Sequence, residues 1–337
     1  MIVVFRADGS SSLGGGHLYR CCALAQQLQE GGAKVVMASS RESYEAFPWL
    51  EKQGFETLAL EPTPEPEAVQ IAVKVKFCDW LVVDHYQRGS EFETSCRVLF
   101  ARRILSLDDR PHRFHDCDLL LDPTLHRGAQ EYFPFLTPSS QCLLGPQYAL
   151  LRPQFAERRR RSLAKRRGPL KRLLVMPGAT DPLQLSSQLL EILSHWPDAL
   201  EVDVVGPAPQ VPSNYPSRIQ LRIHHQLEQI AALLSEVDLV LGAAGSASWE
   251  RCCLGLPSLV FVVAENQREI AATLQDYGAA RWLGEASQVD QSKVLETLLD
   301  FRSKPQLLLA MSQKAAALCD GLGCSRVAAR LGEAAMS

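Results

Sequence analysis

The chain has 337 residues, a hydrophobic fraction of 46% and a formal net charge of -3 at pH 7. This length favours two domains of about 150 residues each, and the charge balance excludes a polycation built to hold nucleic acid. No apolar run reaches the ~18 residues of a membrane-spanning helix, and the start MIVVFRADG lacks the features of a signal peptide. We therefore expect a cytoplasmic protein that binds neither nucleic acid nor membrane.

Apolar runs alternate with helical stretches through the first half of the chain. The runs are continuously apolar, which is typical of strands covered on both faces of a parallel sheet. The expected strands are residues 2–5, 34–39, 80–84, 103–109 and 118–122. This pattern predicts a parallel sheet flanked by helices.

A basic stretch, residues 157–172, carries nine basic residues among sixteen and precedes a second series of strands. It lacks interleaved aromatic residues, so a solvated linker helix is favoured over a nucleic-acid or membrane site. The later strands are expected at 173–176, 202–206, 219–223, 238–242 and 258–263. We predict an α/β fold of two Rossmann-like, doubly wound domains with parallel sheets facing a cleft. The domains are 1–155 and 171–337, joined by a linker at 156–170; the last helical segment is compatible with either domain and is counted with the second.

The ten cysteines include the adjacent pairs Cys21-Cys22 and Cys252-Cys253. The sequence contains no C-x-x-C motif and no zinc-like spacing of cysteine to histidine. We expect reduced, mostly buried thiols, without a disulfide framework or a structural zinc site.

The first expected strand leads into RADGSSSLGGGHLYR, in which Gly14, Gly15 and Gly16 precede His17. Glycines at a strand-to-helix turn permit positive φ and a close approach of a ligand to the backbone. The helix that follows points free N–H groups at the same place, which suits an anion. A plain loop and a structural histidine explain the same residues, so local sequence leaves the role of His17 open.

Polar residues also follow two later strands of this half. Asp84, His85 and Tyr86 end one strand, and Asp108 and Asp109 end the next. A carboxylate or phenol there is able to orient an imidazole or to bind hydroxyl groups of a ligand. Each residue alone is equally typical of a turn or a helix cap.

In the second half, strand 238–242 leads into the turn Ala243-Ala244-Gly245-Ser246 and then a helix. Backbone N–H groups with a hydroxyl at such a turn are typical of a phosphate site, and Glu250, one turn later, is placed to reach a ribose. A simple N-cap at Ser246 with Glu250 as its capping carboxylate explains each residue separately. A second turn, MPGATDP, ends the first strand of this half.

The segment GAAGSASWERCCLGLPSLVFVVAENQ resembles the nucleotide-binding segment of bacterial UDP-sugar enzymes with the two-domain glycosyltransferase-B architecture. A longer series of matches includes RADGSSSLGGGHLYRCCALAQQL, VVDHY, LDD, LLDPT, LGPQYALLRPQF, PGATDP, WERCCLGLPS and AENQ. With these motifs the chain is similar to the UDP-2,4-diacetamido-2,4,6-trideoxy-β-L-altropyranose hydrolase family of pseudaminic acid biosynthesis. The matches run in order from about residue 2 to residue 270.

The resemblance implies that water attacks the anomeric carbon with inversion and that UDP departs, releasing the free diacetamido sugar. His17 matches the general base, and Tyr86 or Asp8 is expected to orient it. The residues expected to bind UDP or the sugar are Gly14, Gly15, Gly16, Arg20, Asp84, Gly178, Ala179, Thr180, Gly245, Ser246, Glu250, Asn266 and Gln267. Helix N-termini at Ser246 and at the Gly178 turn are expected to stabilise the charge of the departing UDP.

No cofactor and no metal ion are expected, and the expected partner is the UDP-sugar alone. The oligomeric state stays open, and a monomer is compatible with the sequence. An inverting UDP-sugar glycosyltransferase of the same architecture is the main alternative. A non-enzymatic module that binds nucleotide-sugars is the other, and such a module would not need His17.

Overall fold

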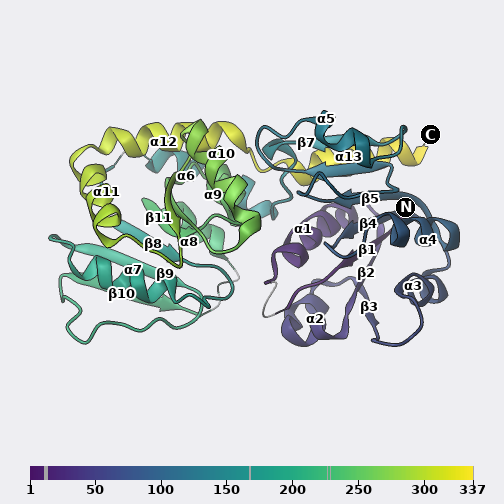
Figure 1. Cartoon of the computed structure of the whole chain (residues 1–337), viewed down its shortest axis with the longest axis horizontal. Helices are drawn as coiled ribbons and strands as arrows, with labels where there is room; N and C mark the ends of the chain where they lie inside the picture. The colour runs from purple at the N-terminus through teal and green to yellow at the C-terminus, as the bar shows by residue number, and fades with distance from the viewer. Residues whose placement is uncertain (11–13, 167, 226, 228, 337) are drawn as a thin grey trace. The chain divides into compact units, whose positions relative to one another are not determined.

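The computed structural model of the chain describes residues 1–10, 14–166, 168–225, 227 and 229–336. The chain divides into two compact units, each built around one parallel sheet (Figure 1). Unit 1 comprises Met1–Arg152 and the chain end from Leu322, and unit 2 comprises Pro153–Gly321. The α/β class and the two doubly wound sheets are therefore confirmed.

Unit 1 contains a seven-stranded sheet of order β3-β2-β1-β4-β5-β6-β7, in which every neighbouring pair is parallel. The strands are β1 (Ile2–Ala7), β2 (Lys34–Ser40), β3 (Glu56–Leu60), β4 (Cys78–Asp84), β5 (Ala101–Leu107), β6 (Leu119–Asp122) and β7 (Gln141–Leu144). The helices are α1 (Gly16–Glu30), α2 (Arg41–Ala46), α3 (Glu67–Val75), α4 (Ser90–Leu99), α5 (Ala129–Tyr132) and α13 (Gly323–Met336), with 3-10 helices η1 (Pro48–Gln53), η2 (Phe133–Phe135) and η3 (Pro146–Tyr148). The strand order reverses between β1 and β4, and ligands of such sheets bind where the strands on either side of the reversal end.

Both faces of this sheet are buried. Val3 and Phe5 of β1 join the core that contains α1, whereas Val4 joins the core on the opposite face. Successive side chains of a strand point to opposite faces, so a strand buried on both sides must be apolar throughout. This is why continuous apolar runs predicted the central strands correctly.

Unit 2 contains a six-stranded parallel sheet of order β10-β9-β8-β11-β12-β13, which reverses between β8 and β11. The strands are β8 (Arg172–Met176), β9 (Leu200–Val205), β10 (Ile219–His224), β11 (Leu239–Ala243), β12 (Ser258–Val262) and β13 (Arg281–Glu285). The helices are α6 (Pro153–Lys165), α7 (Leu185–Ser194), α8 (Ile230–Glu236), α9 (Ala247–Cys253), α10 (Arg268–Tyr277), α11 (Gln291–Ser303) and α12 (Pro305–Leu318), with the 3-10 helix η4 (Glu265–Gln267). Both turns singled out in the sequence, after β8 and after β11, lie at this reversal.

The basic stretch is not a solvated linker, because α6 packs against α8 and α9 of unit 2. Arg159 donates to the carbonyl oxygens of Cys253, Cys319 and Ala316 at 2.5, 2.9 and 2.7 Å. Arg166 is buried and donates to Leu234 O at 2.8 Å and to Val237 O. These carbonyls end α8, α9 and α12, where N–H partners run out and cations are favoured.

The chain end also differs from the expected domain boundaries, because α13 belongs to unit 1 and packs against α1 and η3. Val327 and Leu331 are fully buried in the core of unit 1. The indole N–H of Trp80 donates to Leu331 O at 3.1 Å. An apolar face predicts that a helix is buried, but it does not predict against which of the two sheets the helix packs.

The strands missing from the sequence interpretation are β3, β7 and β13, each of which ends the strand order of its sheet. Their residues are only partly buried, so their sequences mix polar and apolar residues and lack the continuous apolar run. The pattern of apolar residues that predicts a strand is weak in a strand at the edge of a sheet, because such a strand is partly exposed to solvent.

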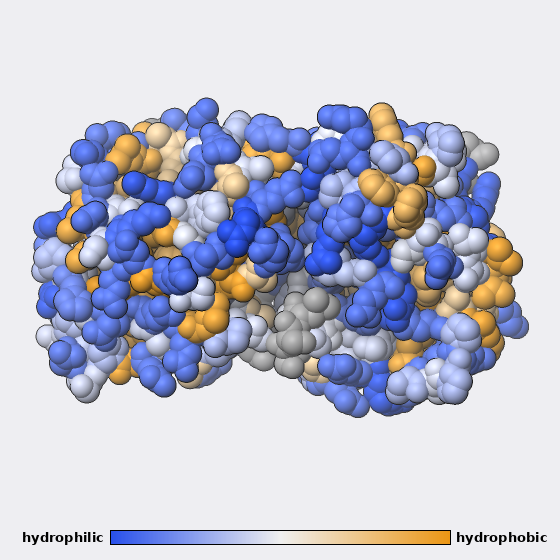
Figure 2. Space-filling model, viewed as in Figure 1, coloured by the Kyte–Doolittle hydropathy of each residue, from blue (hydrophilic) through white to orange (hydrophobic). Residues whose placement is uncertain are grey.

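Hydrophilic residues cover most of the face shown in Figure 2, with small groups of apolar residues between them. Among the described residues, no helix is long and apolar enough to cross a bilayer. The ten cysteines form no disulfide bond in the structure, and all but Cys142 are buried, which is the burial that we expected.

Candidate active site

The two strands at the reversal in unit 1 end beside each other, with Ala7 of β1 paired to Asp84 of β4. After β1 the chain returns through Gly14, which has a φ of +77° and whose N–H donates to Ser10 O at 2.8 Å. Gly15 takes the N-cap position, so α1 begins at Gly16. His17 therefore lies in the first turn of α1, as expected.

His17 contacts a carboxylate that we had expected among the ligand contacts. Its Nδ1 lies 2.6 Å from Oδ1 of Asp84, and Arg20 donates to both oxygens of the same carboxylate at 2.6 and 2.5 Å. The side chain of Asp84 has no exposed surface, whereas those of His17 and Arg20 are 11% and 17% exposed. Asp84 therefore lies behind His17 and supports it, which differs from the expected ligand contact.

We infer the tautomer of His17 from the shorter of two contacts at Nδ1, which lies 2.6 Å from Asp84 Oδ1 and 3.1 Å from Nη2 of Arg20. An ionised carboxylate only accepts hydrogen bonds, so the hydrogen of the neutral imidazole is on Nδ1 and the lone pair is on Nε2. Burial alone would raise the pKa of Asp84, but the charges of Arg20 and His17 hold that pKa below its usual range. Among the described residues, Nε2 of His17 has no hydrogen-bond partner. The ring is therefore oriented to accept a proton at Nε2.

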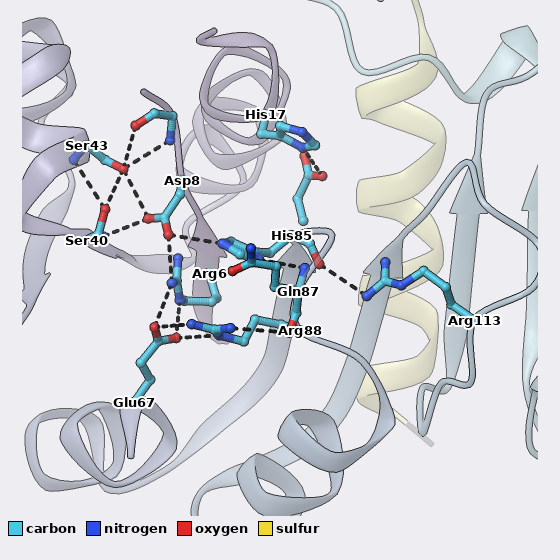
Figure 3. Close-up of polar contacts among 12 residues, drawn as sticks. Arg6, Asp8, His17, Ser40, Ser43, Glu67, His85, Gln87, Arg88 and Arg113 are labelled. Carbon is cyan, nitrogen blue, oxygen red and sulfur yellow. Dashed lines mark hydrogen bonds and ion pairs between the residues drawn. The ribbon is translucent and has the colours of Figure 1, made fainter. Parts of the chain in front are cut away.

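Asp8, one of the two residues expected to orient His17, belongs to a separate network (Figure 3). Its carboxylate accepts from Arg6 at 2.8 Å, His85 at 3.2 Å, Ser43 at 3.1 Å and the N–H of Ser40 at 2.7 Å. The expectation that Asp8 orients His17 is therefore not met. Successive side chains of β1 point to opposite faces of the sheet. Phe5 and Ala7 face α1, which carries His17. Val4 faces the other side, and Arg6 and Asp8 follow it in the alternation.

The Asp8 network continues through a second carboxylate. Glu67 accepts from Arg6 at 2.9 Å and from Arg88 at 2.6 Å (Figure 3). Burial would raise the pKa of Glu67, but the bonds from Arg88 and Arg6 lower it to about 2. The network thus neutralises Arg6, whose side chain has no exposed surface, and it holds the loops after β1 and β4 in place.

Tyr86, the other expected partner of His17, contacts it through the ring. The two rings are perpendicular, with centroids 5.1 Å apart and an interplanar angle of 89°. The Tyr86 hydroxyl donates to both carboxylate oxygens of Asp109 at 3.1 Å. Tyr86 therefore limits rotation of the imidazole but does not bond to its nitrogen atoms.

In unit 2, the turn after β11 brings together several residues expected to bind UDP. Ser246 is exposed, occupies the N-cap position of α9 and makes no capping bond with its side chain, so the simple capping interpretation fails. Gln267 accepts from Val263 N at 3.2 Å, and its Nε2 is the atom nearest to a Cβ built on Gly245, at 3.3 Å. Asn266 is exposed on the same short 3-10 helix. The turn therefore presents backbone N–H groups, a hydroxyl and carboxamides together, with Glu250 one turn further on.

The turn after β8 differs from the expectation in one respect. Gly178 has a φ of +132°, and Ala179 and Thr180 follow it. However, the carboxylate of Asp181 accepts from the N–H groups of Leu185 and Ser186 at 2.7 and 2.9 Å. This carboxylate occupies the N-terminus of α7, so α7 does not offer the free anion site that we expected near Gly178.

A buried arginine lies beneath the turn after β11 and was missed from the sequence. Arg251 is 1% exposed, and its Nη2 donates to Ala243 O at 2.9 Å and to Ser248 Oγ at 2.8 Å. Within the described part of the chain, its Nε and Nη1 have no hydrogen-bond partner. Burial lowers the pKa of Arg251 to about 10. The signal in the sequence was an arginine directly before the apolar residues CCLGL, in a helix pattern whose other charged residue is Glu250.

The described residues contain no group of three or more His, Cys, Asp and Glu side chains placed to hold a metal ion. Five aspartates, Asp8, Asp84, Asp108, Asp109 and Asp122, lie at the carboxyl ends of the strands of unit 1. Four of them form an ion pair with arginine. The ion pairs are Arg6–Asp8, Arg20–Asp84, Arg113–Asp108 and Arg127–Asp122. A metal-free reaction stays a prediction.

Residues 172–322 match the family model of the glycosyltransferase family 28 C-terminal domain. MurG of Acinetobacter baumannii is a solved structure with a TM-score of 0.72 and 17% identity, covering 98% of this chain and 99% of that chain. The chain has the glycosyltransferase-B fold. The spinosyn rhamnosyltransferase SpnG, with a TM-score of 0.63 and 16% identity, has the same fold over 97% of this chain and 99% of its own.

The chain is also similar to curated proteins over most of its length. The spore coat polysaccharide biosynthesis protein SpsG of Bacillus subtilis is 25% identical over 333 residues, 96% of each chain. The UDP-2,4-diacetamido-2,4,6-trideoxy-β-L-altropyranose hydrolase of Campylobacter jejuni is 26% identical over 288 residues, 82% of this chain and 97% of that protein. With the family match, these similarities support an enzyme related to the family 28 glycosyltransferases.

Proposed function

We propose that the protein hydrolyses the anomeric C–O bond of UDP-2,4-diacetamido-2,4,6-trideoxy-β-L-altropyranose and releases UDP and the free sugar. The observation that carries the proposal is the orientation of His17, whose Nδ1 is bonded to Asp84 and whose Nε2 is left to accept a proton. The similarity to the Campylobacter jejuni hydrolase supports the substrate. The coarser form of the proposal is a UDP-sugar enzyme of the family 28 glycosyltransferase kind.

In the proposed reaction, Nε2 of His17 removes a proton from water as the water oxygen attacks the anomeric carbon. The imidazolium that forms is stabilised by Asp84, whose charge persists because Arg20 and His17 hold its pKa below the usual range. The C–O bond to UDP breaks as the new bond forms on the opposite face, so the configuration at the anomeric carbon inverts. His17 then returns its proton to solvent.

Unit 2 is proposed to bind UDP. Backbone N–H groups at Gly245 and Ser246, with the Ser246 hydroxyl, bind the diphosphate, and Glu250 binds the ribose. The buried charge of Arg251 lies below this turn and adds a positive potential to it. Asn266 and Gln267 are proposed to contact the sugar, and the backbone at Gly178, Ala179 and Thr180 contributes to the same UDP site.

A glycosyltransferase reaction is the second candidate, and the family 28 match favours it. His17 would serve equally well as the base for an acceptor hydroxyl, because the acid–base step is the same. The two reactions therefore differ in the acceptor and not in the base.

The deciding experiment incubates purified protein with the UDP-sugar in water labelled with oxygen-18 and no other acceptor. We expect UDP release with the label in the sugar, which demonstrates C–O cleavage by water. UDP release that begins only when a glycan or lipid acceptor is added would establish the transferase instead.

A second experiment tests for a metal ion. We expect full hydrolase activity in the presence of a strong chelator, and a loss of activity that a divalent cation restores would contradict the metal-free mechanism.

A paired variant tests the base. We expect His17→Ala to lower kcat by about 100-fold or more, in the range of general acid–base catalysis, while UDP affinity changes less than about 2-fold. His112→Ala is the matched control, because His112 is exposed in the same unit. A large loss of UDP affinity in His17→Ala would show that His17 belongs to the nucleotide site.

A further inference from the structure

One aspartate at the sheet edge of unit 1 is held differently from the others. Asp8, Asp84, Asp108 and Asp122 each pair with an arginine. The carboxylate of Asp109 instead accepts the hydroxyl of Tyr86, at 3.1 Å from each oxygen. Four of these carboxylates therefore form ion pairs with arginine, whereas the carboxylate of Asp109 accepts a hydrogen bond from a neutral side chain.

Tyr86 is held at three points. Asp109 binds its hydroxyl, the guanidinium carbon of Arg110 lies 3.8 Å from its ring centroid, and its ring stands perpendicular to that of His17. A tyrosine restrained by a carboxylate and by a cation over its ring has little freedom to rotate. The position of the Tyr86 ring against His17 therefore depends on Asp109.

His17 needs this second restraint. The hydrogen bond to Asp84 fixes one ring atom, Nδ1, whereas the direction of the lone pair on Nε2 also depends on the plane of the ring. The perpendicular contact with Tyr86 restricts that plane. A general base that is rotated away from the proton it removes loses rate steeply, because the reaction needs a near-attack geometry.

We propose that Asp109 is a positioning residue that holds the catalytic base, His17, in its working orientation through Tyr86. Asp84 fixes the tautomer of the base, and the pair Asp109–Tyr86 fixes its plane. The proposal rests on the proposed function only for its activity readout, because the orientation of His17 is a property of the free protein. Burial raises the pKa of Asp109, and the charge of Arg20 and the hydrogen bond from Tyr86 offset only part of that rise.

The kinetic experiment compares Asp109→Ala, Tyr86→Phe and the double variant on the UDP-sugar. We expect each single variant to lower kcat by about 10- to 100-fold with KM changed less than about 2-fold, and the double variant to be no slower than the slower single variant. Asp109→Asn keeps an oxygen that accepts from Tyr86 and is expected to restore kcat to within about 3-fold. The proposal would be overturned if the double variant lost kcat by the product of the two single losses. It would also be overturned if Asp109→Ala raised KM and did so equally in the Tyr86→Phe background, because Asp109 would then contact the substrate.

The second readout needs no turnover. The imidazole nitrogen resonances of His17, assigned with His17→Gln, are followed by NMR in the free protein. We expect them to shift in Asp109→Ala and in Tyr86→Phe but not in Asp116→Ala, whose carboxylate contacts Thr94 and Arg97. Unchanged His17 resonances in Asp109→Ala would overturn the proposal. A wild-type protein that releases no UDP while these shifts occur would instead refute the proposed hydrolysis and leave the positioning role intact.

Discussion

His115 is a histidine that is buried between two carboxylates behind the loop that carries Asp109. Its Nδ1 lies 2.8 Å from Glu93 Oε1, and its Nε2 lies 2.9 Å from Asp108 Oδ2. Since both partners only accept hydrogen bonds, both ring nitrogens carry hydrogen and the imidazole is charged. Burial alone would lower the pKa of His115, but the bonds to Asp108 and Glu93 raise it to about 9.

This shift predicts a loss of stability as the pH rises. The raised pKa stabilises the folded state fully below the unfolded value of 6.5, and the contribution disappears as the pH rises through about 9. Between pH 6.5 and 8.5 we expect the free energy of unfolding to fall by about 2 kcal/mol through His115. Urea unfolding across this range measures the fall.

The His115→Gln variant isolates this contribution from other titrating groups. The variant should lose the fall between pH 6.5 and 8.5, whereas His112→Gln, at an exposed position, should keep it. A wild-type slope in His115→Gln would show that His115 is not charged in the folded protein.

At the scale of secondary structure, α6 shows that a charge run can be structural. Arg159 of α6 and Arg166, directly after its end, donate to the carbonyls that end α8, α9 and α12, whereas Arg160 and Arg161 of α6 are exposed. Charge density alone does not distinguish these two groups. The distinction depends on which helices end beside α6, and that is decided by the packing of unit 2.

Replacing Arg159 tests this role. Arg159→Met removes the donor to three carbonyls, and we expect a loss of about 2–4 kcal/mol in the free energy of unfolding. Arg160→Met, one residue later on the exposed face of α6, should cost less than about 0.5 kcal/mol. Denaturant unfolding of the two variants measures the difference, and equal losses would mean that α6 contributes by its charge rather than by these bonds.

At the scale of the whole molecule, unit 1 is assembled from both ends of the chain. The helix α13 contributes buried side chains to the core around α1, and its Leu331 carbonyl accepts from Trp80 of β4. The α1 and β4 segments also carry His17 and Asp84. The helix α13 therefore supports, through the core and through Trp80, the two elements that carry the candidate active site.

Leu331→Ala tests this dependence. A fully buried leucine that is truncated to alanine typically costs about 2–5 kcal/mol, and we expect this loss in unit 1 alone. Amide hydrogen exchange should accelerate in α1 and β4 but not in β11 or β12. Glu333→Ala, at an exposed position of the same helix, is the control. Faster exchange in both units would show that they unfold together.

The sequence by itself determined the α/β class, the central strands, and the glycine turn that starts a helix at His17. These features depend on burial and backbone conformation within one segment, which local patterns record. The tertiary structure alone decided the location of α13, the edge strands β3, β7 and β13, and the groups that Arg159 and Arg166 bind. The contact between His17 and Asp84 could be predicted only in part. Every second residue of β4 points to the same face, so the sequence places Asp84 on the face of Trp80 and Val82. What the sequence lacked was the pairing of β1 with β4, which sets Ala7 beside Asp84 and brings that carboxylate under His17. Strand order is set by the packing of all the segments together, so no local pattern contains it.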